Sequence, residues 1–207
     1  MTSRIARIAA VLTALAAMLF LSACSSSGTE SHTEYGQTSE PVITGEPAGF
    51  NADDVAFATD MIPHHEQAVE MADLVPDRST DPEVAALAGE IKAAQQPEIN
   101  ALRVFLVQWN ENPEDGAAGG HEGGHGAMQG MVDDATMAKM QSLKGAEFDT
   151  LWLQSMIAHH EGAIEMAKAE IANGENVDAK AMAQTIVDAQ QAEIVRMNQI
   201  LEGGQNG

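Results

Sequence analysis

Apolar residues recur three or four positions apart through most of the chain beyond residue 50, as on one face of an α-helix. Alanine, methionine, leucine, glutamate and glutamine are abundant there, and all favour helix. No run of alternating β-branched residues is long enough to indicate a strand. The pattern predicts an all-α protein with four main helices and a short one, at residues 51–75, 80–110, 133–143, 145–172 and 177–202.

The limits of these helices come from residues that cap or interrupt a helix. Asn51 is a good N-cap, and the segment Thr80-Asp81-Pro82-Glu83 combines a capping box with a proline in the first turn. Asn173 and Gly174 end the third main helix. Pro97 predicts a kink in the second, because proline removes a backbone hydrogen bond.

The chain contains an internal repeat, in which Met61-Ile62-Pro63-His64-His65-Glu66 returns as Met156-Ile157-Ala158-His159-His160-Glu161. The register holds without a gap from residues 60–106 to residues 155–201, with 18 identities in 47 pairs. Each copy covers one long helix and most of the next. Two related helical hairpins predict an antiparallel four-helix bundle, and we expect its first and third helices to be diagonally opposed.

The first 23 residues have the pattern of an export signal. Arg4 and Arg7 precede an apolar stretch that is too short for an ordinary membrane span. It ends in Leu21-Ser22-Ala23-Cys24, which resembles a bacterial lipobox. The resemblance implies cleavage before Cys24, attachment of lipid (palmitate) to its sulfur, and a membrane-anchored protein on the extracytoplasmic face. An ordinary secretory signal or an uncleaved anchor is the alternative.

The remainder divides by composition. Residues 24–49, rich in Ser, Thr, Glu, Gly and Pro, predict a flexible tether. Residues 50–205 suit one bundle domain with a single core. Within it, the Gly- and Ala-rich residues 111–131 predict a mobile linker, which contains His121 and His125.

The charge of the chain excludes some partners. The formal net charge is −21, and loss of Arg4 and Arg7 with the signal takes it to −23. Such an excess argues against nucleic acid, because nothing neutralises phosphates. It also argues against a basic patch for anionic lipid, so membrane attachment is expected through the lipid anchor alone.

A helical wheel predicts where the repeated histidines lie. With Met61 at 0° and about 100° per residue, the apolar stripe of the first helix is centred near about 30–40°. His65 falls inside this stripe, at about 40°, and His64 at its edge, at about 300°. Glu66 points away from it. The second copy repeats the arrangement, so inward-facing His65 and His160 are the leading candidate ligands, each with Met61 or Met156 one turn before it.

The other repeated positions allow two interpretations each. His64 and His159 are either co-ligands or solvent-facing, and Met71 and Met166 are either ligands or ordinary core residues. Gln95, Gln96, Gln190 and Gln191 recur in the partner helices and are candidate hydrogen-bond partners for the imidazoles.

The donor types indicate which metal would bind. The only cysteine is Cys24, which the lipid would occupy, so thiolate ligands are excluded. Thioether sulfur is soft and selects copper(I), while imidazole accepts copper in either oxidation state. The set therefore favours a copper ion over zinc or iron.

The repeated Met-Ile-x-His-His-Glu, followed by Ala-x-x-Met-Ala and by Gln-Gln-x-Glu-Ile in the partner helix, resembles domain-of-unknown-function family 305. Residues 145–149 strengthen the match, which covers roughly residues 50 to 201. The resemblance implies a ferritin-like bundle, secretion or lipid anchoring, and an association with copper binding. It carries these properties onto His64, His65, His159, His160, Met61, Met156, Met71 and Met166.

Two other metal chemistries fit less well. His121-Glu122-Gly123-Gly124-His125 matches the H-E-x-x-H pattern of zinc proteases, but its glycines disfavour the helix that the mechanism needs. A metal-capturing loop or an inert linker remains open there. A di-iron site needs Glu-x-x-His pairs, which the repeat lacks.

The sequence therefore predicts a non-enzymatic, lipid-anchored copper protein for sequestration or transfer of the ion. The alternatives are a ferritin-like di-metal or redox enzyme, and a structural or partner-binding bundle without metal.

Overall fold

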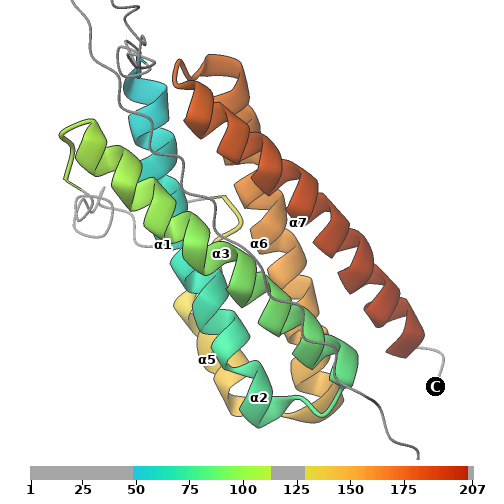
Figure 1. Ribbon diagram of the computed structural model, residues 1–207. Helices are drawn as coiled ribbons and strands as arrows, with labels where there is room; N and C mark the ends of the chain where they lie inside the picture. The colour runs from blue at the N-terminus through green and yellow to red at the C-terminus, as the bar shows by residue number, and fades with distance from the viewer. Residues whose placement is uncertain (1–48, 113–128, 205–207) are drawn as a thin grey trace, which may run out of the picture. The chain divides into compact units, whose positions relative to one another are not determined.

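The computed structural model describes residues 49–112 and 129–204. In these ranges the chain is helical apart from short connections, as predicted, and no strand occurs (Figure 1). No helix in these two ranges is both long and apolar enough to cross a bilayer. The helices are α1 (Ala52–Asp73), α2 (Val75–Arg78), α3 (Pro82–Gln108), α5 (Asp134–Ser142), α6 (Gly145–Asn173) and α7 (Val177–Gly204).

The capping residues explain most of these limits. The Asn51 side chain accepts hydrogen bonds from the backbone N–H groups of Asp53 and Asp54, and the Asp54 carboxylate accepts one from the Asn51 N–H, which completes a capping box. The predicted cap of α3 was displaced by one residue. Asp81, rather than Thr80, is its N-cap, because Pro82 already occupies the first helical position. The helix then continues through Pro97.

The long helices form two hairpins, α1 with α3 and α6 with α7, seen side by side in Figure 1. The hairpins meet through α1–α6 and α3–α7 packing. Helices α1 and α6 are antiparallel: Asn51 donates to the Asn173 carbonyl at one end, and the Trp152 Nε1–H donates to the Met71 carbonyl at the other. The expected diagonal placement of these two helices was therefore wrong, because each lies directly against the other.

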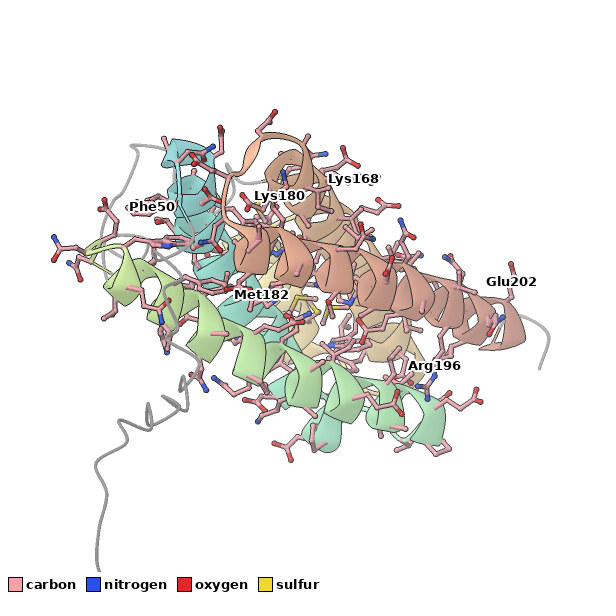
Figure 2. The ribbon with its side chains drawn as sticks, turned by 45° about the horizontal axis from the view of Figure 1, so that its top comes forward. Phe50, Lys168, Lys180, Met182, Arg196 and Glu202 are labelled. Carbon is pink, nitrogen blue, oxygen red and sulfur yellow. The ribbon has the colours of Figure 1, made fainter. Side chains whose placement is uncertain are left out.

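Helices α3 and α7 contact each other less extensively than α1 and α6 do. Arg196 of α7, labelled in Figure 2, forms an ion pair with Glu90 of α3. Both side chains are at least one-third exposed, so this pair contributes little to stability. The α1–α6 interface is thus the main junction between the two hairpins.

The hydrophobic core consists of two clusters. A residue of one repeat copy lies in one cluster, and its counterpart in the other copy lies in the other cluster. Ala68 and Ile91 belong to the first cluster, while their repeat counterparts Ala163 and Ile186 belong to the second. Leu102 lies in the second cluster and its counterpart Met197 in the first. The duplication seen in the sequence is therefore a pseudo-twofold axis in space.

A buried pair of carboxyl groups links α1 to the turn between α6 and α7. The Asp54 carboxylate accepts backbone hydrogen bonds from Glu175 at 3.1 Å and Asn176 at 2.9 Å. Glu170, buried beside it, has no donor for either carboxyl oxygen among the described residues. A Cβ on Gly174 would lie 2.3 Å from a Glu170 oxygen, so a larger residue there would displace the Glu170 carboxyl group. Lys180, labelled in Figure 2, donates to the Gly174 carbonyl.

These contacts determine which of the two carboxyl groups, Glu170 or Asp54, carries a proton. Burial, followed by the hydrogen bond and the charge of Asp54, raises the pKa of Glu170 to about 8. Burial also raises the pKa of Asp54, but the backbone N–H groups of Asn51, Asn176 and Glu175 outweigh it and lower that pKa overall. Glu170 is therefore protonated at neutral pH and can donate its proton to Asp54.

This pair predicts a pH-dependent stability. Between 4.5, the ordinary value, and about 8, the folded protein holds a proton that the unfolded chain has lost, so Glu170 makes the folded state progressively less stable as pH rises. Glu170→Gln keeps a donor to Asp54 at every pH. Between about pH 6 and pH 9 the wild-type melting temperature should fall by roughly 5–10 °C more than that of the variant. The exposed-site control Glu165→Gln should follow the wild type, and equal pH profiles for all three proteins would contradict the assignment.

Candidate metal centre

A layer of polar side chains separates the two hydrophobic clusters on each of the four long helices. On α1, for example, His64 and His65 lie between Ile62 of the second cluster and Ala68 of the first. We call this layer the polar belt, and every member is at most 3% exposed: His64, His65, Gln95, His159, His160 and Gln190. A polar layer across the middle of a helical core costs desolvation energy, so it calls for a specific explanation.

The imidazoles of His64 and His159 contact each other where α1 crosses α6. Their ring centroids are 3.8 Å apart and the rings are inclined by 40°. The two residues are repeat counterparts, so the pseudo-twofold axis passes between them. Burial, and then the neighbouring His65, lowers the pKa of His64 to about 3. Burial and then His64 lower the pKa of His159 well below its ordinary value. Both rings are therefore neutral at physiological pH.

The other two histidines each hold a glutamate from the partner helix. His65 Nε2 lies 2.9 Å from Glu98 Oε2, and His160 Nε2 lies 2.7 Å from Glu193 Oε2. An ionised carboxylate only accepts hydrogen bonds, so each histidine donates from Nε2. The wheel missed these partners, although Glu98 and Glu193 are identical positions of the repeat.

The expectation that glutamines bond the imidazoles was wrong for the described residues. Gln95 and Gln190 are buried in the belt, but their amides have no hydrogen-bond partner among the described residues. Gln96 and Gln191 are exposed and point away from the imidazoles.

Hydrogen bonding leaves lone pairs free in the belt. His64 also donates from Nε2, to the Gln129 carbonyl at 3.3 Å. In His64, His65 and His160 the remaining Nδ1 is therefore unprotonated, and it has no partner in the described part of the chain. Neither ring nitrogen of His159 has one. Anchoring one nitrogen while the other stays free is the usual state of a histidine prepared for a metal ion.

The methionines of the repeat occupy two different settings. Met61 and Met156 are fully buried, one helical turn before His65 and His160, at the borders of the belt. Met71 is fully buried two turns further along α1. Its counterpart Met166 is half-buried and lines a surface pocket with Asp60. Thus Met61 and Met156 are the buried methionines that lie one helical turn from belt histidines.

The structure places His64 and His159 deeper than the wheel did. The wheel put them at the rim of the stripe, yet both are 0% exposed, as are His65 and His160. The reason is the direct packing of α1 on α6, which turns the rim of each stripe into an interface. Glu66 and Glu161 lie outside this centre, as predicted: Glu66 forms an ion pair with Arg103 at 2.6 Å, and Glu161 is exposed.

No three His, Cys, Asp or Glu side chains within residues 49–112 and 129–204 already converge to hold a metal ion. A bound ion would therefore need a thioether in its coordination sphere or a rotation of an imidazole. The predicted Cys24, His121 and His125 lie outside the described residues.

Comparison with solved structures gives the same fold. A DUF305 protein of Streptomyces coelicolor, described as secreted, is 33% identical with a TM-score of 0.63, and the match covers 74% of this chain and 94% of that one. A DUF305 fragment of Deinococcus radiodurans is 27% identical with a TM-score of 0.67, over 76% of this chain and 99% of that one. CopM in its Cu(II)-bound form is 30% identical with a TM-score of 0.63, over 72% and 96%. CopM has also been solved in Cu(I)- and Ag-bound forms.

A curated relative matches a smaller part. Uncharacterized protein L153 of Acanthamoeba polyphaga mimivirus is 39% identical over 54 residues, which is 26% of this chain. The chain thus spans about 36% of the length of that relative.

The model of the family "Domain of unknown function (DUF305)" matches residues 54–201, a stretch that includes the whole polar belt and both glutamates. The chain belongs to the DUF305 family.

Proposed function

We propose that this protein binds copper in the polar belt and sequesters the ion or passes it on at the cell envelope, without catalysing a reaction. The observation that carries the proposal is the set of five unpartnered ring nitrogens on four buried histidines. Buried polar atoms in native proteins are nearly always satisfied, and unexplained ones indicate an absent ion or water. The similarity to copper-bound CopM supports an ion.

The donor set favours copper over zinc or iron. Neutral imidazole nitrogens and the Met61 and Met156 sulfurs form a soft-to-borderline set, which suits Cu(I) and also accepts Cu(II) through nitrogen. Zinc is held by Cys, His, Asp or Glu rather than by thioether sulfur, and di-iron sites need several glutamates. Here Glu98 and Glu193 are already engaged with His65 and His160, where they orient the rings.

If the histidines of the belt serve metal binding, the one without hydrogen bonds should not stabilise the metal-free protein. Because neither nitrogen of His159 is hydrogen-bonded, His159→Leu removes a desolvation cost and should leave stability unchanged or higher. His160→Leu deprives Glu193 of its partner and should cost about 1–3 kcal/mol. Urea unfolding in the presence of a chelator measures both. A loss for His159→Leu as large as that for His160→Leu would indicate a structural histidine network.

Copper binding itself is tested by competition with a chromophoric Cu(I) chelator under anaerobic, reducing conditions. The variant His64→Leu/His159→Leu keeps the volume of the core but removes the central ring pair. Its affinity for Cu(I) should fall at least tenfold, about 1.4 kcal/mol.

The variant His121→Ala/His125→Ala is the control, since it removes the histidines of the linker and none of the belt. It should keep the high-affinity ion. Unchanged stoichiometry and affinity in the belt variant, with loss in the linker variant, would move the site out of the bundle.

The location at the envelope rests on Cys24 and the preceding lipobox-like residues, which belong to the proposal. Cys24→Ser should abolish labelling by a radioactive fatty acid. An unlabelled wild-type protein would contradict lipid anchoring while leaving copper binding unaffected.

A further inference from the structure

A short segment covers the junction of the two central histidines. Residues 129–132, which we call the strap, run across the α1–α6 interface and lead into α5. The Gln129 carbonyl accepts the hydrogen bond from His64 Nε2, and the backbone of Gly130 lies against the α6 backbone at Ala158 and His159. All four belt histidines are 0% exposed, so an ion can reach them only if a covering element moves.

Two side chains of α1 bond the strap, His64 at the Gln129 carbonyl and Gln67 at Val132. The Gln67 amide donates to the Val132 carbonyl at 2.8 Å, and its oxygen accepts from the Val132 N–H at 2.7 Å. This two-point contact resembles one rung of a sheet, supplied by one glutamine. The covering helices are held by continuous backbone hydrogen bonds along their length, whereas the strap is held by the hydrogen bonds to His64 and Gln67, the contact of Gly130 with α6 and the buried Val132. The strap is therefore the element of the cover that costs least to open.

Two glycines allow the close approach on the α6 side. A Cβ on Gly162 would lie 1.9 Å from the Gln129 carbonyl oxygen and 2.9 Å from the Gly130 Cα. Gly130 has φ of 86°, and a Cβ there would lie 2.6 Å from the Ala158 carbonyl oxygen. No other residue fits either position without displacing the strap.

The repeat diverges at the two positions that hold the strap. Gln67 and Gly162 are counterparts in the 95-residue register, between the identical His-His-Glu on one side and the identical alanines Ala68 and Ala163 on the other. A single strap crossing a pseudo-twofold axis meets the same position of both copies. In the first copy Gln67 bonds the strap with its amide, and in the second copy Gly162 lacks the side chain that would collide with it. These two roles explain why this position differs between the copies while its neighbours do not.

An acidic pocket opens beside the strap. It has a volume of about 250 Å³ and is lined by Pro63, Gln67, Val132 and two methionines, with carboxylates that include Glu66 and Glu70. Carboxylates raise the local concentration of cations, and thioethers favour soft ones. The pocket lies next to the Gln67–Val132 contact, so an ion gathered there is adjacent to the strap.

We propose that the strap is the gate of the polar belt, and that a soft monovalent cation enters and leaves from the acidic pocket when the Gln67–Val132 contact opens. This inference rests on the proposed function, whose site it would control. The gate sets the rates of uptake and release, while the belt sets the affinity and the number of ions.

The test measures access to the histidines without metal and the rate of exchange with metal. Gln67→Leu removes both hydrogen bonds to Val132, and Gly162→Ala introduces a methyl group that displaces the strap from α6. Gly89→Ala is the matched glycine control, because a Cβ there has no atom within 4 Å. Gln96→Leu is the matched control for the glutamine, since Gln96 is exposed. Circular dichroism confirms the helical fold of each variant, and either strap variant alone suffices for the test.

Carbethoxylation of His64 and His159 by diethyl pyrocarbonate, followed by mass spectrometry, should be about tenfold faster in the strap variants and unchanged in the controls, as expected for about 1.4 kcal/mol easier opening. Stopped-flow exchange of Ag(I) should accelerate equally, with the number of bound ions unchanged. Equal labelling rates in all five proteins would overturn the gate. Faster labelling with no metal bound by any protein would keep the strap as the cover and overturn the metal site.

Discussion

The desolvation of six polar side chains in the middle of a helical core is the constraint on which the rest of the structure depends. Water would compensate such groups outside the protein, but here five imidazole nitrogens and two amides have no partner in the described residues. A bundle with an apolar layer of similar volume at this level would have a larger free energy of unfolding. The belt therefore lowers the stability of the fold unless a bound group satisfies these atoms.

Duplication explains how so many candidate ligand atoms reach one place. One hairpin contributes two adjacent histidines, a methionine one turn away and a glutamate on its partner helix. A pseudo-twofold axis between His64 and His159 brings the second set into register with the first. The hydrophobic clusters on either side fix the level of the belt, because each packs residues from all four long helices. Symmetry is broken at Gln67 and Gly162, where one strap has to cross both copies.

Much of this arrangement could be predicted from the sequence, because it depends on local signals. Asn51 marks the start of α1 through its own side-chain cap, and the wheel correctly placed His65 and His160 inside. The burial of His64 and His159 could not be found, since a wheel treats one helix alone and α6 packs directly on α1. Glu98 and Glu193 were visible as repeat identities, but their bonds join residues 33 positions apart. The sequence also shows that Gln67 and Gly162 differ between the repeat copies, but the reason for the difference is found only in their contacts with the strap.

The most direct test of the central claim is a long-range ¹H–¹⁵N correlation spectrum of the imidazoles, recorded before and after addition of Ag(I), a diamagnetic substitute for Cu(I). The spectrum resolves Nδ1 from Nε2 in each ring, so it reports which nitrogen binds. We expect the Nδ1 signals of His65 and His160 and at least one ring nitrogen from the His64–His159 pair to shift on saturation. Shifts confined to His121 and His125, with the four belt histidines unchanged, would contradict the account.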